Sequence, residues 1–326
     1  MSVPDSASRK WWIVAAIAAF LAAVVLGVMI GPAGRVSSAN WGIIWNVRMP
    51  RVALAGIVGA MLSLAGASYQ GVFRNPLVDP YLLGVAAGAG LGATIIFAVG
   101  REATRGWPVD PLPVVSFVGG LVAVMITYLV GAAFGASRSG VTLVLAGVAV
   151  VSLFTAIQTF VLQRNNDVIR EVYSWILGRV STATWSDVRL VLPYVVVCSA
   201  VLLLHSRHLD LFRVGDDEAA SLGSDVARVR VIVVIAATMG TAAVVSVSGL
   251  IGFVGVIIPH AVRLLAGASY RRVLPLSLVV GATFLILVDI PGRVLQKPAE
   301  TPIGVVTAFV GAPFFIVLLR SRKTVA

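Results

Sequence analysis

The chain has 326 residues, of which 59% are hydrophobic and only 12% are charged, and its mean hydropathy is +0.98. Soluble globular proteins carry about 25% charged residues, so this composition excludes a soluble domain and indicates an integral membrane protein. The formal net charge of +11 does not indicate nucleic-acid binding, because Arg and Lys are scattered over short connections and form no basic run. Contacts with lipid headgroups and docking proteins account for it better.

About ten apolar stretches are long enough to cross a bilayer, and none has Asp, Glu, Lys or Arg in its centre. They are too long for barrel strands, so we predict an all-α integral membrane protein with about ten transmembrane helices. The predicted spans are Trp12–Ile30, Val52–Val72, Leu82–Val99, Pro113–Phe134, Val141–Leu162, Leu190–Leu204, Val231–Val247, Ile251–Leu265, Val273–Val288 and Ile303–Leu319. The first is predicted to be a retained helix, because no A-x-A cleavage site follows it.

Orientation is predicted from the distribution of Arg and Lys between the connections. Ten spans place both termini on one side of the membrane, and that side carries slightly more than half of the basic residues, including the pair Arg271 and Arg272. We therefore predict a multi-pass protein of the cell (inner) membrane, with both termini cytoplasmic.

The connection between the second and third spans reads RNPLVDPYLLG, from Arg74 to Gly84. Proline disfavours helical geometry in the residue before it, so Pro76 and Pro80 should each keep the chain from forming a helix. We predict a rigid, extended loop at the inner surface. A proline-rich helix connector without a function of its own is the alternative.

Three arginines lie just outside predicted spans on the outer side: Arg48 and Arg51 before the second span, and Arg293 after the ninth. Arginines in such places commonly anchor helices to lipid phosphates.

On the same side, EVYSWILG (Glu171–Gly178) is amphipathic and too short to cross the membrane. It predicts a helix that lies on the outer surface or dips into it, either as a plug or as a parked interfacial helix.

The longest charged connection, His205 to Arg230, is predicted to be cytoplasmic. Asp216 or Asp217 is expected to cap a short helix that ends at Gly223, and Ser224 is expected to cap the next helix. The segment also carries an apolar set, which consists of Leu209, Leu211, Phe212, Val214 and Leu222. A purely solvated loop needs no apolar face, so we favour a docking surface for a protein, with a solvated loop as the alternative.

Several chemistries lack the residues that they require. No G-x-x-x-x-G-K-[ST] motif occurs, so we expect no nucleotide site and no enzymatic activity in this chain. Cys198 is the single cysteine and the three histidines have no ligand spacing, so we expect no metal and no cofactor. An ion-coupled secondary transporter would have only Gln70, Gln158 and His260 as strongly polar groups near membrane depth, which leaves it a weaker alternative.

Three blocks of the sequence, RMPRVALAGIVGAMLSLAGASYQGVFRNPLVDPYLLG, SGLIGFVGVIIPHAVRLLAG and PAETPIGVVTAFVGAPFFIVLLR, resemble the FecCD-type permeases of ABC importers. This family includes the permeases for vitamin B12, haem and iron siderophores. The resemblance implies a type II ABC importer permease fold, with residues 1–326 as a single transmembrane domain. It also implies a homodimer or pseudo-dimer with the substrate path between the subunits, an ABC ATPase subunit below and an extracytoplasmic solute-binding protein above.

The resemblance also implies roles for individual residues. Binding-protein docking falls on Arg48, Arg51 and Arg293, and the cytoplasmic gate on Asn75 and Leu77. ATPase coupling falls on Asp216, Asp217, Glu218, Ala219, Ala220, Leu222, Gly223 and Asp225. The loop near Ser139 matches the family poorly and receives no role, and His260 is interpreted as structural. The expected cargo is a large metal chelate, an iron siderophore or haem, with vitamin B12 as the alternative.

Overall fold

The computed structural model describes residues 6–31, 34–35, 41–103, 106–107, 109–133, 140–296 and 299–322. The first half comprises α1 (Ser6–Met29), β1 (Ile30–Gly31), β2 (Gly34–Arg35), α2 (Trp41–Ile43), the π-helical turn η2 (Ile44–Arg48), α3 (Met49–Val72), α4 (Val85–Ala103), α5 (Pro111–Ala133) and α6 (Gly140–Arg164). The second half comprises η3 (Asn166–Val168), α7 (Ile169–Ile176), η4 (Val180–Thr182), α8 (Trp185–Leu204), α9 (Ser206–Leu211), η5 (Phe212–Val214), α10 (Asp216–Ser221), α11 (Val226–Ser248), α12 (Val254–Ala266), α13 (Tyr270–Val294) and α14 (Ile303–Arg322). Among the described residues, β1 and β2 make the only strand pairing, which is antiparallel.

Seven of the described helices are long and apolar enough to cross a membrane, and Val85–Gly100, Val254–Ala266 and Ile303–Val317 are shorter apolar helices. All ten predicted spans fall on these helices, so the predicted all-α architecture is confirmed. Several boundaries differ from the prediction by three residues or more, and two of these differences concern the outer arginines. The second span begins at Trp41, and α13 continues to Val294, so the three outer arginines lie within helical segments and not beyond them.

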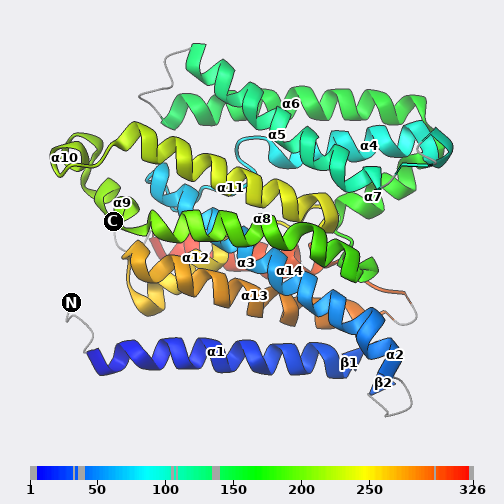
Figure 1. The fold of residues 1–326 in the computed structure, drawn as a ribbon, viewed down its shortest axis with the longest axis horizontal. Coiled ribbons are helices and arrows are strands. Elements are labelled where there is room, and N and C mark those ends of the chain that lie inside the picture. Colours follow the sequence, from blue (N-terminus) through cyan, green and yellow to red (C-terminus); the bar gives the residue numbers. More distant parts are fainter. Residues whose placement is uncertain are drawn as a thin grey trace.

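The long helices lie side by side with their axes along roughly one direction (Figure 1). The start of α1 lies at the end of the molecule where α9 and α10 are found, and the opposite end carries α2, α7 and the β1–β2 pair (Figure 1). We call these the inner end and the outer end, following the predicted orientation.

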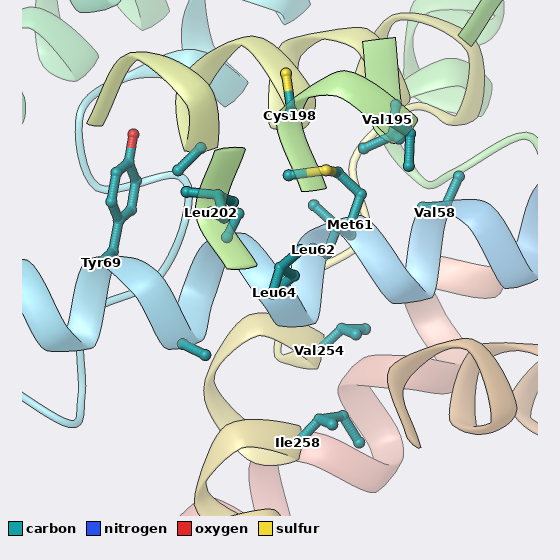
Figure 2. Close-up of a cluster of buried hydrophobic side chains, with 14 of the residues drawn as sticks. Val58, Met61, Leu62, Leu64, Tyr69, Val195, Cys198, Leu202, Val254 and Ile258 are labelled. Atoms are coloured by element: carbon teal, nitrogen blue, oxygen red, sulfur yellow. The ribbon is translucent and has the colours of Figure 1, made fainter. Parts of the chain in front are cut away.

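Helix α3 forms the centre of the core, because nearly all its residues from Pro50 to Val72 are buried. Figure 2 shows Cys198 and Leu202 of α8 on one side of α3, and Val254 of α12 on the other. Near the inner end, the Tyr69 hydroxyl lies 2.6 Å from the Thr238 hydroxyl of α11, so each satisfies a buried polar group of the other. Cys198 is also buried in this core.

Close crossings of these helices are made through glycines. A Cβ atom at Gly59 of α3 would overlap the Gly281 carbonyl oxygen of α13, and a Cβ at Gly281 would overlap the Gly59 carbonyl oxygen. The same reciprocal relation holds between Gly88 of α4 and Gly119 of α5. Small residues therefore let these backbones come into direct contact, as is common in membrane helix packing.

We expect Gly59→Ala to lower the stability of the protein, because the new methyl group meets backbone that cannot rotate away. Overpacking of this kind costs about 1–3 kcal/mol, which outweighs the higher helix propensity of alanine. Gly42→Ala in α2 is the matched control, since no atom lies within 4 Å of a Cβ built there. Thermal unfolding of both variants in the same detergent measures the difference. Equal melting temperatures would contradict the close crossing.

Candidate coupling, gate and docking sites

The predicted gate loop connects α3 to α4 through residues 73–84 and consists of consecutive turns, so the prediction of an extended loop is wrong. The Asn75 side-chain oxygen accepts a hydrogen bond from the Leu77 N–H at 3.0 Å, and Asp79 Oδ1 accepts one from the Tyr81 N–H at 2.8 Å. Each turn has the same sequence pattern, Asn or Asp followed by Pro. This pattern favours a turn closed by the side chain over an extended chain.

The same loop is fastened to α12 and to the segment before it. Gln70 Nε2 donates to the Val78 carbonyl at 3.3 Å and to the Gly255 carbonyl at 3.1 Å. The Tyr81 hydroxyl donates to the Ile251 carbonyl at 3.0 Å and accepts from the Ile251 N–H at 3.1 Å. The predicted rigidity of the loop therefore has a physical basis, and Gln70 holds the loop in place.

The two predicted gate residues, Asn75 and Leu77, are exposed on this anchored loop. Asp79 follows two residues after Leu77. As a whole residue it is half-buried, but its carboxyl group is surrounded by protein atoms. This burial raises its pKa to about 6, and the hydrogen bond from the Tyr81 N–H opposes the rise. Above pH 6 the carboxylate therefore remains the acceptor that closes the second turn.

Asp216, the first residue of α10, links this loop to the predicted coupling segment. Its carboxylate lies 2.9 Å from Arg230 Nη2 of α11 and 3.6 Å from Arg74 Nη2, and Arg74 directly precedes Asn75. Arg74 has a backbone φ of 49°, a left-handed conformation that is uncommon outside glycine. Asp216 or Asp217 was predicted to cap this helix, but the residue at the cap position is Gly215, with a φ of 127°.

The coupling segment contains two short helices, and only α10 corresponds to a predicted one. Helix α9 was not predicted, and the helix expected after Ser224 is the long helix α11. Ala219 is buried, whereas Asp217, Glu218, Ala220, Leu222, Gly223 and Asp225 are exposed. Gly223 follows α10 with a φ of 84°, as its predicted place after the helix requires. Asp225, not Ser224, caps α11, because its side chain accepts from the Arg228 N–H at 3.1 Å.

The apolar set predicted for this segment divides into two parts. Leu209 and Phe212 are fully buried and belong to the main core, while Val214 and Leu222 are 58% and 63% exposed. The segment is also fixed to α13 through Asp210 of α9. This carboxylate accepts from the Ser269 hydroxyl and from the Tyr270 N–H, both at 2.7 Å. The coupling segment is therefore joined to both α13 and the gate loop.

At the outer end, the predicted docking arginines take part in a buried ion-pair cluster. Arg51 Nε and Nη2 donate to the two Asp289 carboxylate oxygens at 2.9 and 2.8 Å, and Arg293 Nε donates to Asp289 Oδ2 at 2.8 Å. Arg51 also donates to Glu300 at 2.7 Å. Arg51 and Arg293 are only 6% and 1% exposed, so both charges are buried within the protein.

Two of the arginines also bind the end of α1. Arg48 Nη1 donates to the Val28 and Met29 carbonyls, each at 3.0 Å, and Arg293 Nη1 donates to the Gly27 and Ile30 carbonyls at 2.6 and 3.1 Å. The last carbonyls of a helix have no partner within the helix, and cations there are favoured by the helix dipole. Arg48 is 7% exposed. The sequence predicts the charge at this end of the membrane but not these partners.

A cavity of about 580 Å³ opens beside this cluster, and Arg51, Asp289 and Glu300 form part of its wall. The opposite wall is α7, the predicted short amphipathic helix at the outer surface, together with the residues after it. Trp175 of α7 is 1% exposed and packs inward, while Arg170 faces solvent and Arg179 is half-buried. Polar and charged side chains therefore surround an opening at the outer end.

The remaining predictions concern single positions. The loop near Ser139 lies outside the described residues. His260 lies next to Pro259 in α12 and is 9% exposed, with its ring centroid 6.3 Å from that of Phe314. Within the described part of the chain, no group of three or more His, Cys, Asp or Glu side chains could hold a metal ion.

Apolar helices long enough to span a membrane, with the short helix α10 joined to an inner loop, agree with the permease fold of a type II ABC importer. Residues 9–321 match the FecCD transport family, and the chain belongs to this family. It is similar to the uncharacterized ABC transporter permease protein YvrB of Bacillus subtilis (strain 168), with 40% identity over 86% of this chain and 80% of the relative.

The cobalamin import system permease protein BtuC of Halobacterium salinarum is also 40% identical, over 86% of this chain and 74% of that protein. A solved structure described as an inward-facing conformation of a putative metal-chelate type ABC transporter is similar in fold. Its TM-score is 0.86 at 31% identity, over 96% of this chain and 99% of that one. Relatives of 34–36% identity are named for import of iron(3+) hydroxamate, Fe(3+) dicitrate and molybdate.

Proposed function

We propose that this protein is the permease subunit of an ATP-driven, binding-protein-dependent importer of a large metal chelate. In this proposal two permease subunits, as a homodimer or pseudo-dimer, enclose the substrate path. A separate ABC ATPase binds the inner end, and an extracytoplasmic solute-binding protein docks at the outer end. The protein lies in the cell (inner) membrane with both termini in the cytoplasm, as its Arg and Lys distribution favours.

The observation that supports this proposal most strongly is the link from α10 to the gate loop through Asp216. A permease without its own nucleotide motif needs a mechanical connection to the partner that binds ATP. The exposed residues of α10 and the following turn, which include Leu222, offer such a partner a mixed apolar and acidic surface. Movement of α10 would pull on Arg74 and thereby on Asn75 and Leu77, so the gate would follow the ATPase.

Docking of the binding protein is proposed at the outer end around the cavity wall that contains Arg51. Because Arg48, Arg51 and Arg293 are buried here, their proposed contribution is to set the position of the surface and to supply its positive potential. Arg170 and Arg179, at the same opening, carry the exposed charge. Such potentials act mainly on the rate and orientation of association with an acidic partner.

For the cargo we propose an iron chelate, either a siderophore or haem. Vitamin B12 is the second candidate, and the 40% identity to a permease named for cobalamin import favours it specifically. The deciding experiment is uptake of labelled ferric siderophore, haem and cobalamin by the complex in proteoliposomes, with its own binding protein present. Uptake of only one of the three identifies the cargo.

We expect uptake to require ATP and to be independent of a proton gradient. The purified chain alone should hydrolyse no ATP, and an uncoupler should leave ATP-dependent uptake unchanged. His260→Gln removes the imidazole of α12 while keeping a side chain that can form hydrogen bonds, so this variant should retain uptake. Uptake that continues without ATP and stops with the uncoupler would contradict the ABC mechanism and support an ion-coupled secondary transporter.

A further inference from the structure

A narrow groove lies at the inner end between the start of α1, the end of α12 and the first turns of α13. Its volume is about 260 Å³. Ile13 and Ile17 of α1 form one wall, and Leu276 and Val279 of α13 form the other. The groove therefore offers an apolar channel about two helical turns long, which runs from the inner end towards the middle of the protein.

Positive charge is concentrated at the inner rim of this groove. Arg271 and Arg272 both line it, and neither lies within ion-pair distance of a carboxylate among the described residues. Arg74, Arg213 and Arg230, which also lie at the inner end, each have such a partner. Arg271 and Arg272 thus present uncompensated charge.

The surroundings of the groove favour one kind of occupant. Only 11% of the span in α1 is buried within the subunit, so this helix is exposed along most of its length and the groove opens to the outside of the subunit. Trp12, at the rim and 42% exposed, is a residue type that is enriched at the level of lipid headgroups. A larger apolar groove of about 780 Å³ between α1, α3, α8 and α13 has no charged residue in its lining and lacks this combination.

We propose that the groove between α1 and α13 binds one anionic phospholipid of the inner leaflet. The phosphate lies between Arg271 and Arg272, and one acyl chain follows the apolar walls towards Ile17 and Val279. Basic pockets between membrane helices on the cytoplasmic side recognise anionic headgroups in this way. This lipid would join α1 to α13 at the inner end. The hydrogen bonds from Arg293 of α13 to α1 join the two helices only at the outer end.

The proposal is tested by native mass spectrometry of the full chain in detergent, titrated with phosphatidylglycerol, phosphatidylcholine or glycerol 3-phosphate. We expect one saturable site for phosphatidylglycerol, at least tenfold weaker binding of phosphatidylcholine, and no binding of glycerol 3-phosphate. Arg271→Gln with Arg272→Gln should weaken phosphatidylglycerol binding roughly thirtyfold. The matched control is Arg207→Gln with Arg228→Gln, which removes two exposed charges of the inner end outside the groove and should have no effect.

A second variant tests the apolar part of the site without changing any charge. Ala16→Phe places a ring in the groove and should weaken phosphatidylglycerol binding about tenfold with an unchanged melting temperature. It decides the matter if the double arginine variant fails to fold. Three results would each contradict the lipid site. The first is that the Arg207 and Arg228 control loses as much phosphatidylglycerol binding as the Arg271 and Arg272 variant. The others are that glycerol 3-phosphate binds as tightly as phosphatidylglycerol, or that Ala16→Phe binds phosphatidylglycerol as tightly as the unchanged protein.

Discussion

Replacing Asp216 with Asn is expected to reduce ATP-driven uptake roughly tenfold while the permease still binds its ATPase. The substitution keeps the shape of the side chain and removes the charge that joins Arg74 to Arg230. The exposed surface of α10 stays intact, so assembly should persist. Uptake is lost because movement of α10 no longer reaches the gate loop. Uptake and ATP hydrolysis are measured with the same reconstituted complex, and the amount of substrate taken up per ATP hydrolysed should fall.

Exchanging the charges of Asp216 and its two arginines distinguishes loss of the ion pairs from general damage to the fold. Asp216→Arg alone places three cations together and should lose uptake, whereas Asp216→Arg combined with Arg74→Asp and Arg230→Asp restores attraction at both contacts. We expect the triple variant to recover a substantial part of the uptake. If Asp216→Asn transports normally, or if its complex with the ATPase falls apart, the proposed link from α10 to the gate is wrong.

Replacing Asp289 with Ala is expected to destabilise the protein by about 3–5 kcal/mol, because it leaves two buried guanidinium groups without their shared carboxylate. Both Arg51 and Arg293 bond to Asp289, which is itself only 2% exposed. Chemical unfolding in mixed micelles, followed by tryptophan fluorescence, measures the loss of free energy of unfolding.

Glu300→Ala is the matched control for this prediction. Glu300 also pairs with Arg51, but it is 25% exposed, and Arg51 keeps Asp289 when Glu300 is removed. Its loss should cost about 1 kcal/mol or less. Equal destabilisation by both variants would show that burial does not distinguish the two carboxylates.

The cluster also changes how docking should be tested. Reversing Arg48, Arg51 and Arg293 to Glu would put buried carboxylates against Asp289 and against the carbonyls at the end of α1. Loss of docking in such a variant would report unfolding. Arg170 and Arg179 line the same opening and are more accessible, so they are the better positions for charge reversal.

The spans were predictable from the sequence because a hydrocarbon layer imposes one strong and local requirement, a long apolar run. The second helix of the coupling segment was predictable from similarly local signals, the acids at its start and Gly223 at its end. The turns of the gate loop were missed although their signal is local: Asn75–Pro76 and Asp79–Pro80 favour turns closed by side chains.

The ion pairs could not be predicted in the same way. Arg51 and Asp289 lie 238 positions apart, and an arginine at the end of a span satisfies a lipid phosphate as well as a carboxylate. Which partner it has depends on how α3 and α13 cross, and that crossing is set by the backbone contact of Gly59 with Gly281. The same holds for Asp216, whose two partners lie in the gate loop and in α11.

The bonds from Arg293 to the end of α1 impose an order on the making of this protein. The Gly27 carbonyl leaves the ribosome 266 residues before the guanidinium group that will bind it. At typical synthesis rates this delay is on the order of ten to fifty seconds. Throughout that interval the Gly27 carbonyl lacks its arginine and bonds to water or lipid headgroups, whereas Arg48, which binds the Val28 and Met29 carbonyls, is made soon after α1. The outer end of α1 is therefore completed among the last steps of biogenesis, and a chain that stops before Arg293 never completes it.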